Sequence, residues 1–295
     1  MLAPNVAIHA NFSHETRVGS SANIVRHLHS RTKYPRAANI ANHRPRDAIA
    51  PATSTSQTRM IPFRDNQASR RLTLINVMLI AANIAVFVYE ASLGRGIEGF
   101  IYQYAMIPAH LTSALEGGRE MVRLPYATFA APPALETVVT SMFLHGGILH
   151  LAGNMLYLFI FGAAVEEAMG HLRFLLFYLI CGIASALAMA AFTPHSTVPV
   201  IGASGAIAGV LGAYFVLYPR ARISTILPIF VLMYVVEIPA IVYLLIWFIA
   251  QLYAGLSQNP EVAGGIAWWA HVGGFLVGML LGPMLVIRAP KARRR

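Results

Sequence analysis

Long apolar runs separated by short polar segments constrain this chain more than any other feature. An uncharged run of about 20 residues can cross the hydrocarbon core of a bilayer as a helix. Only 12% of the 295 residues are charged, whereas soluble domains carry about 25%. The sequence therefore predicts an all-α polytopic membrane protein, a bundle of six transmembrane helices. The expected helices are 72–89, 138–164, 172–192, 204–217, 239–256 and 267–287.

The run 223–256 has 34 residues, too many for a single span. Pro239 favours a helix that begins there, since proline suits the first helical position. Residues 223–236 are then expected along the cytoplasmic interface in an extended conformation. Glu237 would complement the positive N-terminal end of the following helix. The alternative is a carboxylate within the membrane that relays protons.

Basic polar segments flank the apolar body. Residues 1–59 are rich in Arg, His, Ser and Asn and predict a disordered basic extension. Their few acids and several arginines resemble a mitochondrial presequence, but no clear amphipathic helix is present. Met60 is an alternative natural start. The predicted membrane domain covers 60–288, and 289–295 form a basic tail.

The distribution of Lys and Arg predicts the orientation in the membrane. With the N-terminus in the cytoplasm, the two short outer loops contain no Lys or Arg, and the long outer loop has three Arg against five Glu. The basic residues beside the other helix ends lie inside. This bias predicts that both termini are cytoplasmic. Six helices with no additional N-terminal span favour a bacterial cytoplasmic membrane. Charge at the ends of an apolar body indicates topology anchors in a lipid bilayer, not a surface that binds nucleic acid.

A serine flanked by glycines opens the shortest expected helix, at GASG (202–205). Helix 204–217 would be only about 21 Å long at 1.5 Å per residue. Ser204 should therefore lie below the outer surface, and the preceding loop must dip inward. Irregular backbone at that depth is tolerated when it is buried in protein or lines a wet cavity. By itself, Ser204 could also be a small packing residue.

Two stripes of glycine predict which helices meet at Ser204. Gly274, Gly278 and Gly282 follow His271 at spacings of 3, 4 and 4, which places all four on one helix face. Helix 204–217 carries Gly205, Gly209 and Gly212. Such stripes let membrane helices approach closely. If the stripes face each other, His271 lies beside Ser204 and can act as its base.

Side-chain donors on helix 138–164 complete the expected chemistry. His150 and Asn154 are four residues apart and share a face. With the backbone N–H of Ser204, they could stabilise the oxyanion of acyl transfer. No Asp occurs in 72–295, so a Ser-His-Asp triad cannot form there and a Ser204–His271 dyad is expected. His145 and Glu166 are expected to hold the outer and inner loops.

Three segments resemble the rhomboid family of intramembrane serine proteases: HGGILHLAGN (145–154), GASG (202–205) and AHVGGFLVG (270–278). The resemblance extends from about Met60 to the end of the chain. It implies a six-helix bundle, a catalytic pair of Ser204 and His271, and oxyanion donors His150 and Asn154. It also implies hydrolysis of single-span transmembrane proteins near the outer membrane face, with the fifth helix and outer loops controlling access.

This chain departs from the family at one position near the histidine. Some members carry a tyrosine one turn after the serine, and it stacks on the histidine; Ala208 stands there in this chain. Support for the His271 ring must then come from elsewhere.

Two alternatives to a protease remain open from the sequence. A catalytically silent rhomboid-like protein would bind membrane clients, but retention of Ser204, His271, His150 and Asn154 argues against it. A six-helix transporter would be expected to show internal repeats and paired broken helices, and neither is evident. The lone Cys181 excludes an internal disulfide and a site of several cysteines. No metal or organic cofactor is implied.

Overall fold

The computed structural model describes residues 61–67, 73–118, 121–123, 128–130, 133–229, 232–257 and 266–287. The predicted N-terminal extension, the alternative start at Met60 and the basic tail lie outside the described residues.

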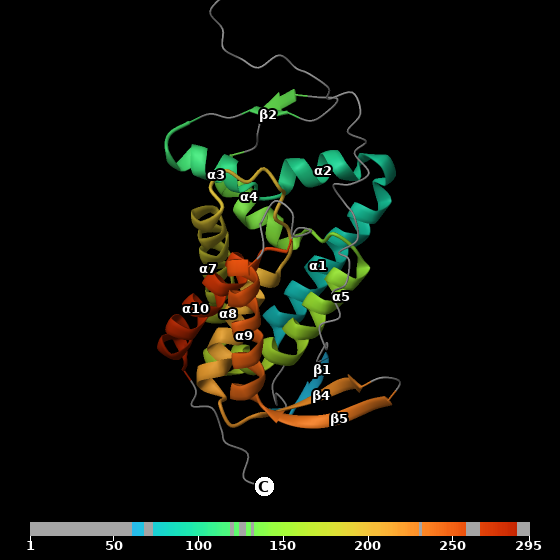
Figure 1. Cartoon of the computed structure of the whole chain (residues 1–295), viewed down its shortest axis with the longest axis vertical. Coiled ribbons are helices and arrows are strands. Elements are labelled where there is room, and N and C mark those ends of the chain that lie inside the picture. Colours follow the sequence, from blue (N-terminus) through green and yellow to red (C-terminus); the bar gives the residue numbers. More distant parts are fainter. Residues whose placement is uncertain are drawn as a thin grey trace, which may run out of the picture. The chain divides into compact units, whose positions relative to one another are not determined.

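Five helices in the described ranges are long and apolar enough to cross a membrane. They are α1 (Leu74–Ser92), the continuous helix Ile148–Met169, α7 (His171–Phe192), α9 (Ala240–Ser257) and α10 (Trp268–Leu285). The sixth predicted helix is α8 (Ser204–Leu217), which is shorter at 14 residues. These helices run roughly side by side (Figure 1). The predicted polytopic, mainly helical bundle is confirmed.

The expected helix 138–164 is wrong at both ends. The structure has α4 (Ala134–Thr140) and a 3-10 turn, η3 (Ser141–Phe143), then a loop. The long helix follows as α5 (Ile148–Tyr157), a π-helical turn η4 (Leu158–Gly162) and α6 (Ala163–Met169). Gly147, at φ +155°, and Gly170, at φ +81°, bound this helix, because glycine adopts positive φ at low cost. His145 therefore lies in a loop and not on a helix.

The connection after α1 contains short elements. These are a 3-10 turn η2 (Gly94–Gly96), α2 (Ile97–Tyr104), α3 (Pro108–Leu115) and the antiparallel strands β2 (Met121–Arg123) and β3 (Thr128–Ala130). Figure 1 shows α2 and α3 at one end of the helices, across their direction.

A three-stranded antiparallel sheet lies at the opposite end of the helices (Figure 1). Its order is β1 (Ile61–Asp65), β4 (Arg222–Ile229) and β5 (Leu232–Pro239). The expected extended conformation is thus confirmed for 223–229 and 232–236. Glu237 lies in β5, exposed and 3.6 Å from Arg222, which excludes a proton relay inside a span. Pro239 ends the strand, and α9 begins one residue later.

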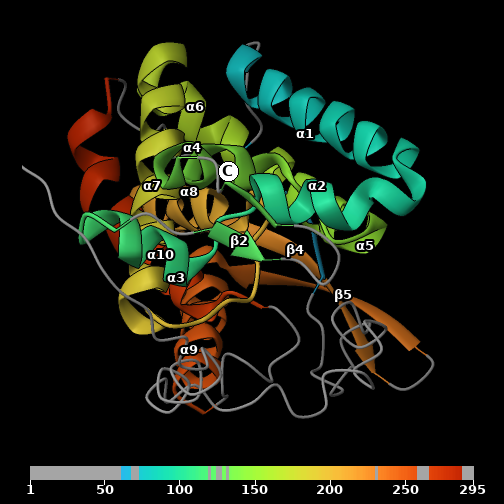
Figure 2. The same cartoon turned by 90° about the horizontal axis from the view of Figure 1, so that it is seen from above.

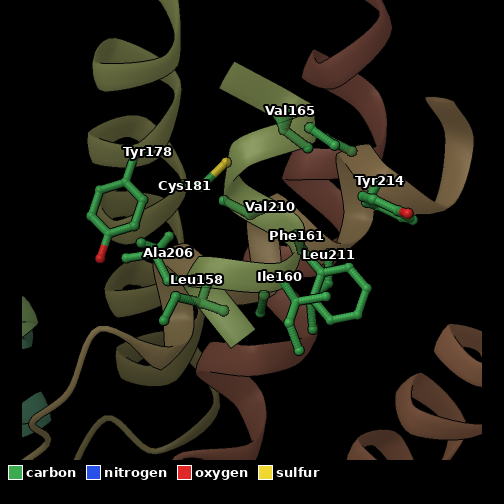
Figure 3. Packing of buried hydrophobic residues seen from close by; sticks show 14 of the residues in the cluster. Leu158, Ile160, Phe161, Val165, Tyr178, Cys181, Ala206, Val210, Leu211 and Tyr214 are labelled. Carbon is green, nitrogen blue, oxygen red and sulfur yellow. The ribbon is translucent and has the colours of Figure 1, made fainter. Parts of the chain in front are cut away.

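Helix α8 is enclosed by its neighbours. Every residue from Gly205 to Tyr214 is buried, and in Figure 2 α8 lies among the other helices whereas α9 lies at their edge. Figure 3 shows side chains of α8 packed against side chains of two neighbouring helices. The labelled residues are Leu158, Ile160, Phe161 and Val165 from Ile148–Met169, Tyr178 and Cys181 from α7, and Ala206, Val210, Leu211 and Tyr214 from α8.

Glycines bring the backbones of α8 and α10 into direct contact. A methyl group on Gly274 would overlap the carbonyl oxygen of Gly205, and one on Gly278 would overlap that of Gly209. We call these four residues the glycine seam. The two helices meet through these residues as predicted, because only glycine permits such an approach.

The other side of the seam differs from the expectation. A methyl group on Gly205 or Gly209 would point toward α7, at Ser185 and Cys181 respectively. These glycines therefore serve two neighbours: their carbonyl groups meet α10, and their missing side chains leave room for α7.

Glu166 joins the start of α1 to the end of the long helix. Its buried carboxylate accepts hydrogen bonds from the backbone N–H groups of Ile75 and Asn76, at 3.0 and 2.7 Å, and also contacts His171. We expected Glu166 to hold the inner loop, whereas it binds backbone groups in the first turn of α1. A carboxylate is favourable there because a helix N-terminus is positive and has unpaired N–H groups.

Candidate functional site

Ser204 and His271 are in hydrogen-bonding contact. Ser204 is the first residue of α8, and its Oγ lies 2.8 Å from Nε2 of His271 near the start of α10. Both residues are half-buried. The glycine seam begins one residue after Ser204 and three residues after His271, so backbone packing determines the separation of the two side chains.

Backbone hydrogen bonds hold the loop that leads to Ser204. Met106 and Val200 exchange N–H···O bonds at 3.2 and 2.8 Å, and Gly202 donates to the carbonyl of Ser141 at 2.8 Å. Gly202 has φ +121°, a conformation that other residues rarely adopt. The loop is therefore fixed to the connection between α2 and α3 and to η3 before the helix begins.

The predicted oxyanion donors converge on Gly202. A methyl group on Gly202 would lie 2.9 Å from Nε2 of His150 and 3.5 Å from Nδ2 of Asn154. Within the described ranges, the buried Nδ2 of Asn154 has no hydrogen-bond partner. An unused buried donor costs free energy, so this amide is available to an acceptor that enters the site.

The hydrogen bond at Nδ1 of His150 indicates its tautomer. Gly146 donates its backbone N–H to that nitrogen at 3.4 Å. In a neutral imidazole the other nitrogen then carries the proton. Nε2 of His150 is thus a donor directed at the same turn as Asn154. The first N–H groups of α8 also lack acceptors within the helix, and its N-terminal end is positive.

His145 lies beside this group of donors but faces other partners. Its backbone N–H donates to the buried carboxylate of Glu90, at 3.3 and 3.2 Å, and its Nδ1 lies 3.2 Å from the carbonyl oxygen of Phe143. Burial, with a smaller effect of His150, lowers the pKa of His145 to about 4. The ring is therefore neutral at pH 7. These contacts suit the expected structural role, here in the loop before α5.

Sequence reasoning missed Gln251 on α9. Its Oε1 lies 2.7 Å from Nδ1 of His271. A signal was present, because Gln251 is the one amide side chain in an otherwise apolar stretch of α9, and polar groups inside membrane helices usually have a function.

Two indole rings flank His271. The ring centroids of Trp247 and Trp268 lie 5.9 and 6.3 Å from that of the imidazole. They come from α9 and from the first turn of α10. They supply aromatic contacts although Ala208 replaces the stacking tyrosine of some family members.

A small cavity adjoins Ser204. Ser141 and Ser185 add hydroxyl groups to a mainly apolar lining that includes Met142 and Ala270. Both hydroxyls already donate to backbone carbonyls, at 3.2 and 2.8 Å. These two hydroxyl groups give the cavity polar atoms beside Ser204.

The sequence model of the Rhomboid domain matches residues 132–288, more than half of the chain. The segment contains α5, α8 and α10, and hence Asn154, Ser204 and His271. Combined with the five long apolar helices, this match identifies an integral, multi-pass membrane protein.

Curated relatives come from a plant, a bacterium and a yeast. RHOMBOID-like protein 6, mitochondrial, of Arabidopsis thaliana is 33% identical over 151 residues, 51% of this chain and 44% of the relative. Rhomboid protease GluP of Bacillus subtilis (strain 168) is 50% identical over 76 residues, 26% of this chain and 14% of the relative.

Rhomboid protein 1, mitochondrial, of Saccharomyces cerevisiae is 29% identical over 163 residues, 54% of this chain and 44% of the relative. The chain spans less than half the length of these relatives. They do not support the predicted bacterial membrane over a mitochondrial one. The matched domain and the ordered motifs within it lead to one conclusion: the chain belongs to the rhomboid family.

Proposed function

We propose that the protein is an intramembrane serine endopeptidase that hydrolyses transmembrane proteins near the outer membrane face through a Ser204–His271 dyad. The observation that carries the proposal is the 2.8 Å contact between Ser204 Oγ and His271 Nε2. It lies beside a buried Asn154 amide donor that has no partner among the described residues.

In the first step, Nε2 of His271 accepts the hydroxyl proton of Ser204 while Oγ attacks the carbonyl carbon of the substrate peptide bond. The hydroxyl is a weak nucleophile at neutral pH, so transfer of its proton to an adjacent base is essential. The short distance suits a direct transfer without an intervening water.

The attack places a negative charge on the former carbonyl oxygen. Nδ2–H of Asn154, Nε2–H of His150 and the backbone N–H of Ser204 stabilise this charge. One such donor typically accelerates the reaction about 10²- to 10³-fold. The positive N-terminal end of α8 adds to the effect.

Collapse of the tetrahedral intermediate breaks the C–N bond. The imidazolium of His271 gives its proton to the leaving amine, and an acyl-enzyme on Ser204 remains. Water then attacks the ester with His271 again as base, which regenerates the hydroxyl and releases the new carboxyl terminus.

Transmembrane proteins are the proposed substrates because Ser204 opens a helix inside the bundle. Arg220 and Arg222 follow the other end of α8, about 21 Å away at 1.5 Å per residue. Basic residues favour the cytoplasmic side. The proposed orientation therefore has Ser204 toward the outer face, and both termini in the cytoplasm.

The test is cleavage of a single-span membrane protein that contains a helix-destabilising segment, with the full chain purified in detergent. Wild type is expected to cleave, whereas Ser204→Ala and His271→Ala are expected to be inactive. Ser113→Ala and His195→Ala are matched controls, because Ser113 lies in α3 and His195 is exposed in the connection just after α7.

Undiminished cleavage by Ser204→Ala would contradict the mechanism. A folded wild type that binds the substrate without cleaving it would favour the silent, client-binding alternative.

A further inference from the structure

His271 makes a second hydrogen bond that bears on the proposed reaction. Its Nδ1 lies 2.7 Å from Oε1 of Gln251, whose side chain is almost fully buried. An amide oxygen can only accept, so Nδ1 carries the proton. A neutral imidazole has one N–H group, and Nε2 is therefore left with a lone pair that faces Ser204.

We propose that Gln251 is a positioning residue that selects this tautomer of His271; the proposal rests on the proposed function. With the proton on Nε2, the imidazole could only donate to the Ser204 oxygen and could not accept its proton. The amide of Gln251 thus has the orienting task that a carboxylate performs in a Ser-His-Asp triad.

A neutral amide suits this location better than a carboxylate would. No Asp occurs in 72–295, and an ionised side chain inside a membrane helix is costly. Gln251 supplies an acceptor without a charge. It also leaves the imidazolium that forms during the reaction without a buried counter-ion, so proton release to the leaving amine is favoured.

A second contact from the same helix restrains the ring. Trp247 precedes Gln251 by four residues, so the two share one face of α9. Its ring centroid lies 5.9 Å from that of His271. The amide and the indole together restrict both the rotation and the proton position of the imidazole, at a site where Ala208 provides no aromatic ring.

The first test compares two replacements with wild type in the cleavage assay on the full chain. Gln251→Met keeps the size of the side chain but removes the amide acceptor, and it should lower kcat about tenfold with KM unchanged. Gln251→Glu keeps an acceptor and should retain more of the wild-type kcat than Gln251→Met does. Leu245→Met, an exposed position on α9, is the matched control and should have no effect.

The second test reads the tautomer directly and does not require activity. Nitrogen-15 chemical shifts of His271 in the detergent-solubilised wild type should show a protonated Nδ1 and an unprotonated Nε2. Gln251→Met should shift the pattern toward a mixture of tautomers.

A wild type with the proton on Nε2, or wild-type kcat in Gln251→Met, would overturn the role of Gln251. Cleavage that survives in Ser204→Ala would instead overturn the proposed function, so the two failures are distinguishable.

Discussion

Helices α8 and α9 both contribute to the candidate site, but the protein holds them in different ways. In α8 all residues from Gly205 to Tyr214 are buried, and its backbone meets that of α10 through the glycine seam. Only 28% of the α9 span is buried, and its contacts with the site are side chains. Ser204 thus lies on a helix enclosed by its neighbours, whereas Gln251 comes from a helix that leaves most of its surface outside the bundle.

This difference separates two requirements of the proposed reaction. The Ser204–His271 distance depends on close packing of backbones, which is intolerant of added atoms. The orientation of the His271 ring depends on single hydrogen bonds and ring contacts, each of modest energy. Substitutions in the two regions should therefore differ in size and in kind.

The largest effect is expected in the glycine seam. Gly278→Ala would place a methyl group against the Gly209 backbone, which cannot yield, and should lower the free energy of unfolding by about 3 kcal/mol or more. Gly182→Ala is the matched control, because its methyl group would overlap the flexible end of Met142 and would lie at an ordinary contact distance of 3.4 Å from Cβ of Ala206. It should change stability by less than about 1 kcal/mol. Unfolding in mixed micelles measures the free energy of unfolding of both variants. Equal losses in Gly278→Ala and Gly182→Ala would contradict the claim that close backbone packing in the glycine seam holds α8 against α10.

A large effect on rate, without loss of stability, is expected at Asn154. Asn154→Ala removes a donor that is unpartnered among the described residues and should lower kcat about 10²- to 10³-fold. Because the Asn154 side chain makes no hydrogen bond to the described residues, the free energy of unfolding should fall little beyond the packing change. Steady-state cleavage and unfolding measurements check this. A loss of stability with unchanged kcat would assign Asn154 a structural role.

A smaller effect is expected where α9 meets α5. The hydroxyl groups of Tyr157 and Tyr243 lie 2.7 Å apart, and one such bond contributes about 1 kcal/mol. Tyr157→Phe, Tyr243→Phe and the double variant form a cycle whose coupling energy should have that size. If the changes in free energy of unfolding of the two single variants simply add in the double variant, the hydrogen bond does not hold α9. The variants should fold normally, unlike those in the seam.

The smallest effect is expected near the C-terminal end of α8, where Asp65 accepts a hydrogen bond from Tyr214 at 2.6 Å. Burial raises the pKa of Asp65 above its ordinary 3.8, although the Tyr214 bond opposes this. The stabilising contribution of the protonated form is therefore complete below pH 3.8 and is lost as the pH rises through the raised pKa.

At pH 7 the ionised carboxylate costs stability that an amide would not. Asp65→Asn should be more stable than wild type at pH 7, and the difference should vanish as the pH approaches 4. Unfolding measured across this range checks the sign; a variant that is less stable at pH 7 would contradict it.

The helices and the main contact of the site were predictable because membrane helices satisfy their own backbone hydrogen bonds. Their lengths and faces are therefore readable from apolar runs and glycine spacing: α8 was predicted as 204–217, and the meeting of Ser204 and His271 followed from the two glycine stripes.

Other features depend on contacts between distant segments and could not be read locally. The break at Gly147 divides an apolar run that periodicity alone reads as one helix. Strand β1 pairs with β4, which lies far away in the sequence, so this pairing cannot be read from local residues. Gln251 faces His271 because of the rotation of α9 about its own axis, which an apolar sequence with little periodicity does not reveal.

The most direct test of the central claim is labelling with a serine-reactive fluorophosphonate, followed by mass spectrometry of the modified peptide. A paired Ser204 and His271 predict a single phosphonyl adduct on Ser204, absent in Ser204→Ala and strongly reduced in His271→Ala. No adduct on a folded wild type, or an adduct that persists in Ser204→Ala, would contradict the account.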